Sequence, residues 1–281
     1  MIQKILIAVA GLGKCEQMLK MLMEIPAIQG ANITILHVVS SQVTAALMAE
    51  KLTAGGKILA GAIEYLKLDP AKVNVRLKQG DPKDTVCQVA EEENSDLIIM
   101  GSRGLNRLES ILANSVSQYV FQLTSRPMLL VKDDVYIKHI SRIMVGYDNS
   151  IPAQASLKLA LSFLRDLKGS QLLLTQVKAD LKSANALTNP EQDPIFAPAI
   201  NEAKKQGVAY KCIVTAGNPG QEICKAAEEF NADLIMIGSP DRRPSIAKNL
   251  PDIDRLLGNS ISDYVRVKAP CPVLLTRSAI S

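Results

Sequence analysis

Short apolar runs alternate with longer stretches of helical periodicity along the chain. In the first half, five apolar runs rich in branched residues predict buried strands over 4–9, 33–39, 73–77, 97–100 and 128–131. Between them, helical spacing predicts helices over 15–23, 43–66, 82–93 and 115–122, with a break allowed at Gly55-Gly56. Pro82, directly after Gly80-Asp81, marks a helix start. This alternation predicts a parallel sheet covered by helices on both faces.

The second half of the chain repeats the first. GDPKDTVCQVAEEENSDLIIMGS at 80–102 returns as GNPGQEICKAAEEFNADLIMIGS at 217–239, with about half of the positions identical. KILIAV, NSVSQYV and RPMLLVK likewise return as RIMVGY, NSISDYV and CPVLLTR. The offset is 137 or 138 through the fourth strand and 145 beyond it, so the second copy has an insertion behind Gly238. We therefore predict two α/β domains, 1–134 and 139–281.

Composition narrows the classes of partner. Hydrophobic residues make up 47% of the 281 positions and aromatic residues 4%, with no Trp. The 32 basic and 28 acidic side chains leave a net charge of +4 without a basic block, so we expect neither a nucleic-acid nor a membrane partner. Five dispersed cysteines without a CxxC pair indicate reduced thiols. No apolar run approaches the roughly 18 residues of a membrane span, and we expect a cytoplasmic protein.

Candidate ligand-binding residues follow the strands, because doubly wound sheets bind ligands beyond the carboxyl ends of their strands. Gly101-Ser102-Arg103-Gly104 follows the fourth strand, and Asn114-Ser115-Val116-Ser117 opens the next helix. Glycines admit a ligand close to the backbone, and a helix start offers N–H groups and hydroxyls to an anion. Each motif by itself fits a tight turn or a helix cap equally well.

This arrangement, matched by several separate blocks in order and in both copies, resembles the universal stress protein family. The resemblance implies a tandem member, each domain a five-stranded parallel sheet with helices on both faces (adenine nucleotide alpha hydrolase-like). It also implies that the domains pair through their last strands, here 128–131 and 273–276, and a further homodimer is compatible with it. Such pairing would protect both sheet edges.

The resemblance implies an adenine nucleotide (ATP, ADP or AMP), alone or with Mg²⁺, as the ligand. In the first domain the implied binding residues are Val39, Gly101, Arg103, Gly104, Asn114, Ser115, Val116 and Ser117. In the second they are Asp148, Val177, Gly238, Ser239, Gly258, Asn259, Ser260, Ile261 and Ser262.

Neither copy matches the pattern of the ATP-binding members in full, which is G-x2-G-x9-G-(S/T) with an Asp closing the first strand. The first copy has Asn114 for the third glycine and Ala10 for the Asp. The second keeps Asp148 but has Asp241 for the second glycine and an insertion at 240–256. Arg242-Arg243 in that insertion fits a lid over a phosphate or a solvated loop. We predict that the first copy has the better phosphate loop.

The function that follows is a stress-response sensor or regulator and not an enzyme, with weak ATPase activity left open. His37 and His139 are the only histidines, which leaves no material for a catalytic triad or a histidine metal site. We expect His37 to be either a core residue or a satisfied polar residue, and Glu91-Glu92-Glu93 to be a solvated helix end. One alternative is a scaffold that acts through protein partners. The other is a slow phosphohydrolase that uses Asp148 and Asp241.

Overall fold

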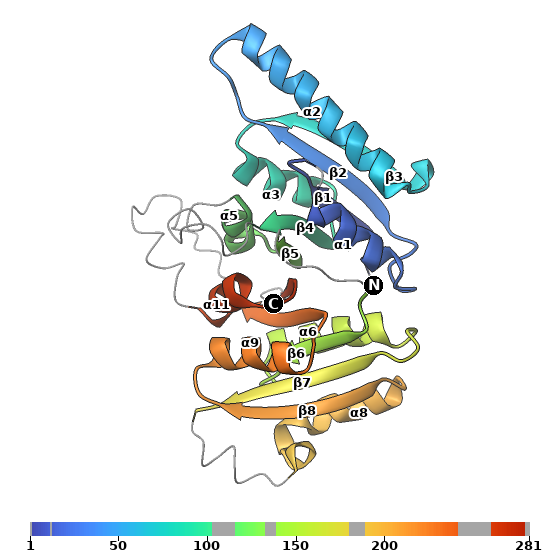
Figure 1. The fold of residues 1–281 in the computed structure, drawn as a ribbon, viewed down its shortest axis with the longest axis vertical. Helices are drawn as coiled ribbons and strands as arrows, with labels where there is room; N and C mark the ends of the chain where they lie inside the picture. The colour runs from blue at the N-terminus through green and yellow to red at the C-terminus, as the bar shows by residue number, and fades with distance from the viewer. Residues whose placement is uncertain are drawn as a thin grey trace. The chain divides into compact units, whose positions relative to one another are not determined.

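The computed structural model describes residues 2–11, 13–102, 116–132, 139–179, 189–240 and 260–278. The chain divides into two compact units, a first one within residues 2–134 and a second one built mainly from residues 135–281 (Figure 1).

The first unit is a five-stranded, wholly parallel sheet in the order β3-β2-β1-β4-β5. Its elements are β1 (Lys4–Ala8), α1 (Lys14–Met23), β2 (Asn32–Val39), α2 (Ala45–Leu66), η1 (Pro70–Lys72), β3 (Val73–Gln79), α3 (Pro82–Glu92), β4 (Leu97–Ser102), α5 (Val116–Leu123) and β5 (Met128–Lys132). Helix α1 packs against α2, and α3 packs against α5. Right-handed crossovers place these two pairs on opposite faces of the sheet. The predicted α/β fold is confirmed.

Central strands of this sheet are buried on both sides. Ile5, Leu6 and Ile7 are successive residues of β1, and none is more than 1% exposed. Because neighbouring side chains of a strand point to opposite faces, this burial requires helices on both faces. At the start of the strand, Asp96 Oδ2 accepts the N–H groups of Gln3 at 2.8 Å and Lys4 at 3.0 Å. This carboxylate ties the entry of β1 to the entry of β4.

Helix α2 continues through Gly55-Gly56, so the expectation of a possible break there is wrong. A Cβ on Gly55 would lie 2.8 Å from His37 Cδ2 and 2.9 Å from Leu77 Cδ1. The missing side chain lets the helix approach β2 and β3 closely. The helix ends at Lys67, whose φ of 49° is left-handed.

The second unit repeats this architecture with the parallel order β8-β7-β6-β9-β10. Its elements are β6 (Arg142–Gly146), α6 (Ile151–Leu164), β7 (Gln171–Lys178), η2 (Pro190–Gln192), η3 (Pro194–Phe196), α8 (Ala197–Lys205), β8 (Ala209–Ala216), α9 (Pro219–Glu229), β9 (Leu234–Pro240), α11 (Ile261–Lys268) and β10 (Val273–Ser278). Asp233 Oδ2 accepts the N–H groups of Ser141 and Arg142 at 2.8 and 2.7 Å, as Asp96 does for the first copy.

The connection after the second strand differs between the units. In the first it is the 22-residue helix α2, whereas in the second η2 and η3 precede the nine-residue helix α8. Asp193 Oδ2 forms an ion pair with Lys178 Nζ at 2.8 Å, and Asp193 Oδ1 caps η3 by accepting the N–H of Ile195 at 3.1 Å. Phe196 is fully buried, and its ring stacks on Tyr147 with the centroids 6.4 Å apart. The second connection is therefore anchored to the ends of β6 and β7.

Candidate functional site

The carboxyl ends of β1 and β2 in the first unit are joined by backbone and side-chain hydrogen bonds. Val9 donates its N–H to Leu36 O at 2.9 Å, and His37 Nδ1 lies 2.7 Å from Val9 O, to which it donates. The expectation that His37 is a satisfied polar residue is thus confirmed. Val39 O accepts the N–H of Gly80 at 3.0 Å, so a ligand would share this carbonyl with the turn after β3.

The structure describes both flanks of the predicted phosphate loop in the first unit. Gly101 is the last residue but one of β4, and a Cβ placed on it would lie 3.2 Å from Cys15 Sγ at the start of α1. Val116 opens α5, a helix that packs on β4, and Ser117 on its first turn is 4% exposed. The predicted residues between the flanks lie outside the described part of the chain: Arg103, Gly104, Asn114 and Ser115.

Glu16 at the start of α1 was not among the predicted site residues. Its Oε2 accepts the N–H of Gly13 at 3.0 Å, which completes a capping box. Its Oε1 is buried and has no hydrogen-bond partner among the described residues. Burial raises the pKa of the Glu16 carboxyl, although two backbone hydrogen bonds oppose the rise. The Gly-x-x-Glu spacing was the available sequence signal for this cap.

In the second unit, Asp148 lies in a turn between β6 and α6. Its Oδ1 accepts the N–H of Ser150 at 3.0 Å, and Ser150 caps α6 by accepting the N–H of Ala153 at 3.4 Å. Tyr147 donates its hydroxyl to Asn149 Oδ1 at 2.9 Å, and Asn149 has a left-handed φ of 60°. Asp148 is exposed, so its carboxylate serves the turn and also reaches solvent.

Gly238 at the end of β9 is confined by the start of α6. A Cβ on it would lie 2.2 Å from the carbonyl carbon of Pro152 and 2.6 Å from Ala153 N. Close packing of helix on strand is thus a sufficient reason for this glycine. The adjacent Ser239 is 3% exposed, and its Oγ accepts a hydrogen bond from Arg277 Nη1 at 2.9 Å.

The start of α11 carries a carboxylate within its own cap. Ser260 Oγ accepts the N–H of Asp263 at 3.1 Å, donates to Asp263 Oδ2 at 2.7 Å and lies 2.9 Å from Ser262 Oγ. Asp263 is 4% exposed, and Arg266 Nε lies 3.8 Å from its Oδ1. Burial lowers the pKa of the Arg266 guanidinium, and Asp263 opposes that effect. Ile261 is 47% exposed, whereas Gly258 and Asn259 lie outside the described residues.

Comparisons with known proteins decide the family. The model of the universal stress protein family matches residues 1–132 and again residues 139–277. The chain belongs to the universal stress protein family. It carries two family domains in tandem.

Individual relatives match in part or in fold. A universal stress protein of Methanocaldococcus jannaschii is 35% identical over 74 residues, which are 25% of this chain and 46% of that protein, so the chain spans less than half of its length. The crystal structure of a universal stress protein from Archaeoglobus fulgidus covers 98% of this chain and 96% of its own, at 21% identity and a TM-score of 0.76, and shows the same fold. An Arabidopsis thaliana family member solved with AMP bound covers 50% of this chain and 93% of its own, at 18% identity and a TM-score of 0.36. A match at that score assigns no ligand to this chain.

Strand register gives the correspondence between the two universal stress protein domains. Ala8 pairs with Leu36, and the equivalent Gly146 pairs with Thr175. Counting onward along β2 and β7, Val39 corresponds to Lys178, whose carbonyl accepts the N–H of Gly217 at 3.1 Å. Val177, which the sequence paired with Val39, therefore lies one residue earlier in the strand.

The same correspondence reveals a difference in charge at the predicted phosphate sites. The motifs NSVSQYV and NSISDYV align Gln118 on α5 with Asp263 on α11. A carboxylate in the first turn of a helix occupies the positive end of its dipole, where a phosphate would otherwise be favoured. The first universal stress protein domain has a neutral side chain at that point.

The described residues offer little material for covalent or metal chemistry. Burial, with Asp84 and Glu91 nearby, raises the pKa of the Cys87 thiol to about 11, so it is protonated near neutral pH. No group of three or more His, Cys, Asp or Glu side chains in the described ranges could hold a metal ion. None of the helices that the structure describes is long and apolar enough to span a bilayer.

Proposed function

We propose that this universal stress protein is a cytoplasmic stress-response regulator that binds an adenine nucleotide through its first domain. The observation that carries the proposal is the neutral Gln118 at the start of α5, where the second domain has the buried Asp263. Phosphate oxygens would lie between Gly101 and the start of α5, where the amide end of the helix and its dipole favour an anion.

The described flanks fit such a ligand. A Cβ on Gly101 would be tight but not prohibitive against Cys15 Sγ at 3.2 Å, so backbone approach at this glycine is not fully used by internal packing. In the second domain the approach at Gly238 is already taken by Pro152 and Ala153. We therefore assign the nucleotide to the first domain and a mainly structural role to the second.

Regulation would follow from differential affinity. A nucleotide that binds one arrangement of the two domains more tightly than another shifts the population toward that arrangement. We propose that the domains pair through β5 and β10, with further homodimerisation as an option, and that the protein is not an enzyme.

A protein-binding scaffold is the second candidate. It is favoured by the second domain, in which Ser260 and Asp263 satisfy one another within the helix cap. A slow phosphohydrolase is less favoured, because one oxygen of Asp148 accepts a turn N–H from Ser150.

The test begins with the purified protein as it is isolated. Denaturation followed by mass spectrometry should release AMP, ADP or ATP, and calorimetry with each nucleotide should give one site per chain. Gly104→Val in the first loop should weaken binding at least about tenfold by blocking phosphate approach. Asp148→Asn in the second domain should leave affinity unchanged.

Three outcomes would overturn parts of this proposal. Release of no nucleotide together with no heat of binding would favour the scaffold. Binding that survives Gly104→Val but is lost in Asp148→Asn would move the site to the second domain. ADP formation from ATP that Asp148→Asn abolishes would establish the phosphohydrolase.

A further inference from the structure

A cavity of about 350 Å³ opens in the first unit at the amino ends of its strands, opposite the carboxyl ends that carry the predicted nucleotide site. It is bounded by the starts of β1, β2 and β3 and by the end of α3. Its volume falls within the range of small-molecule pockets. The lining includes three cations, Lys4, Lys72 and Arg76.

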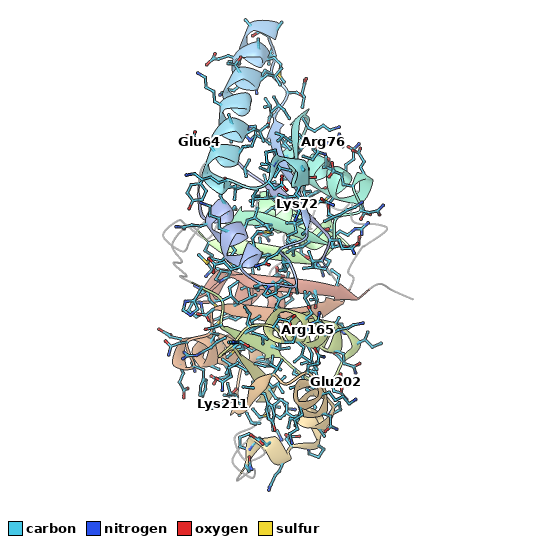
Figure 2. All side chains as sticks on the ribbon, turned by 90° about the vertical axis from the view of Figure 1, so that its right-hand side faces the viewer. Glu64, Lys72, Arg76, Arg165, Glu202 and Lys211 are labelled. Carbon is cyan, nitrogen blue, oxygen red and sulfur yellow. The ribbon has the colours of Figure 1, made fainter. Side chains whose placement is uncertain are left out.

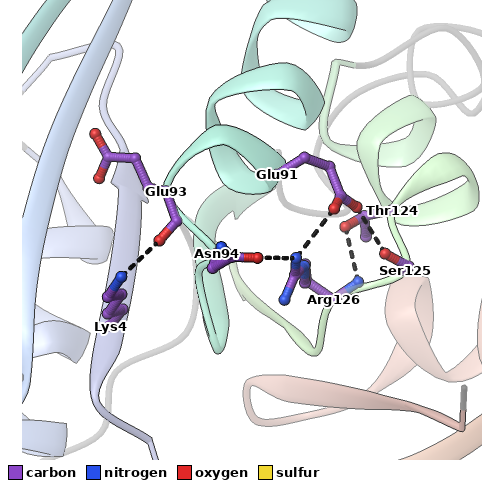
Figure 3. Close-up of polar contacts among 7 residues, drawn as sticks. All are labelled: Lys4, Glu91, Glu93, Asn94, Thr124, Ser125 and Arg126. Carbon is purple, nitrogen blue, oxygen red and sulfur yellow. Dashed lines mark hydrogen bonds and ion pairs between the residues drawn. The ribbon is translucent and has the colours of Figure 1, made fainter.

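A polar network builds the inner wall of this cavity. Glu93, at the end of α3, accepts a hydrogen bond from the Thr34 hydroxyl and pairs with Arg76 Nε at 3.0 Å. Lys4 Nζ donates to the backbone carbonyl of Glu93 at 3.2 Å (Figure 3). Thr34 is 7% exposed, and the Glu93 side chain 15%. The expectation of a solvated helix end is therefore wrong for Glu93, because two strands supply it with partners.

Neighbouring contacts fix the end of α3 from its other side. Arg126 Nη2 donates to Glu91 Oε2 at 3.0 Å and to Asn94 Oδ1 at 3.1 Å, and Ser125 donates to Glu91 Oε1 at 2.7 Å (Figure 3). The backbone from which Glu93 and Asn94 project into the lining is thus held in place before any ligand arrives.

The second unit has apolar side chains at the three positions equivalent to Thr34, Arg76 and Glu93. Strand register and the aligned repeats match Thr34 with Leu173, Arg76 with Ile213, and Glu93 with Phe230. Leu173 is 1% and Ile213 5% exposed, and Lys211 Nζ lies 4.3 Å from the centroid of the Phe230 ring.

The apolar version shows that the fold does not need the polar network. The Arg76 side chain is 40% exposed, and an ion pair with an exposed partner contributes little to the free energy of unfolding, so stability alone does not explain Glu93 and Arg76. A retained polar network that faces a cavity is better explained by a ligand.

We propose that this cavity binds a small metabolite with an oxyanion head, either a carboxylate or a phosphate. Glu93 uses Nε of Arg76, and no described residue accepts from the remaining guanidinium N–H groups or from Lys72 Nζ. Lys72 and Arg76 lie on the same face of the first unit (Figure 2). The amides of Asn32, Asn74 and Asn94 also line the cavity, where Asn74 Nδ2 donates to Glu93 Oε1 at 3.4 Å and Asn94 Oδ1 accepts from Arg126.

The net charge of the lining indicates the charge of the anion that the cavity would bind. Arg76 neutralises Glu93, and Glu92, which accepts from Gln88 Nε2 at 2.7 Å, remains as a carboxylate against Lys4 and Lys72. The balance is one positive charge, which suits a single oxyanion head and disfavours a polyphosphate.

The binding test uses the full chain and three probes at constant ionic strength: inorganic phosphate, acetate and pyrophosphate. Backbone amide NMR shifts should move in 70–76 and 92–96, and not in the equivalent 207–213 and 229–233. Phosphate and acetate report which oxyanion is preferred, and pyrophosphate should bind least. Shifts in none of these segments at millimolar concentration would overturn the proposal, as would equal shifts in the two halves.

Variants separate a built site from nonspecific attraction. Lys72→Ala should weaken binding about tenfold, the effect of losing one charge-assisted hydrogen bond, while Lys57→Ala on the exposed face of α2 makes the same charge change without effect. The combined change Thr34→Leu, Arg76→Ile and Glu93→Phe copies the second unit and should abolish binding with the circular-dichroism melt retained. Equal weakening by the two lysine variants, or unchanged binding in the folded triple variant, would overturn the site. Because these amides lie away from Gly101 and α5, the result is independent of the nucleotide proposal.

Discussion

The two halves of the chain carry the same glycine near the end of the fourth strand, but its surroundings differ. A side chain on Gly101 would meet one sulfur atom of Cys15 at 3.2 Å, whereas on Gly238 it would meet the backbone of Pro152 at 2.2 Å. A sulfur at the end of a side chain can move, but the first turn of a helix cannot move without displacing the helix. The same motif residue is therefore open to a ligand-binding role in the first half and fixed by packing in the second.

The largest expected effect comes from testing these two glycines together. Gly238→Ala should destabilise the second unit by about 3 kcal/mol or more, because the clash is with backbone. Gly101→Ala should cost the first unit less than about 1 kcal/mol, because the Cys15 side chain can shift slightly. Denaturant unfolding that is monitored by amide hydrogen exchange in each half measures the loss in free energy of unfolding for each variant. Similar losses for the two variants would contradict the comparison.

The connections after the second strand give a second contrast. The first half uses the long helix α2, and Gly55 in this helix lies against His37 and Leu77, whereas a Cβ on Gly56 would meet nothing within 4 Å. Gly55→Ala should lower stability by about 1 kcal/mol, since overpacking exceeds the gain in helix propensity.

Gly56→Ala is the matched control for this helix. It should raise the free energy of unfolding by about 0.5–1 kcal/mol, because only the helix propensity changes. Thermal unfolding of both variants is sufficient to measure the two signs. A gain in both variants would show that α2 can retreat from β2 and β3 without cost.

The corresponding connection in the second half depends on an ion pair, and therefore on pH. Burial alone would raise the pKa of Asp193, but the Lys178 ammonium and the N–H of Ile195 hold the pKa below its ordinary value. A depressed folded-state pKa contributes stability above the unfolded pKa, near 4, and loses it as pH falls through the folded value.

This smallest effect should appear as local opening. Asp193→Asn should speed amide exchange in 190–196 at about pH 7 by an amount equivalent to about 0.5–1 kcal/mol, and the difference from wild type should vanish at about pH 2. Among the described residues 40–72, which form the equivalent connection of the first half, no side chain makes such an ion pair, so exchange in 45–54 serves as the control. A difference that persists in acid would assign the effect to packing.

Most of the fold could be predicted from the sequence, because apolar periodicity reports burial directly and the repeat doubles the signal. The run 97–100 became Leu97–Ser102, and Pro82 starts α3 as predicted. What failed depends on the approach of distant segments. Gly55 was interpreted as a weak point of the helix, because the sequence does not show that β2 and β3 lie against it.

The candidate site was predictable only in outline. Val39 can be matched with Lys178 only from the pairing of the strands. The second copy has one residue more between its first and second strands, and the sequence motifs do not show where it is inserted. The polar network around Glu93 was not predicted, although an alignment of the two repeats places Phe230 at the position equivalent to Glu93. A charged residue in one copy of a repeat that aligns with an aromatic residue in the other copy is a signal that a single copy cannot provide.

Because the network of Thr34, Arg76 and Glu93 occurs in one half of the chain, it determines the number of metabolite sites per chain. A symmetric dimer of identical subunits must carry every such feature twice, so occupancy of one copy can influence the other. In this tandem chain the first half has the polar network, whereas the second half has Leu173, Ile213 and Phe230 at the same three positions. With one such cavity per chain, the fraction of chains with bound metabolite would rise hyperbolically with metabolite concentration. The response of the protein would then be graded and not cooperative.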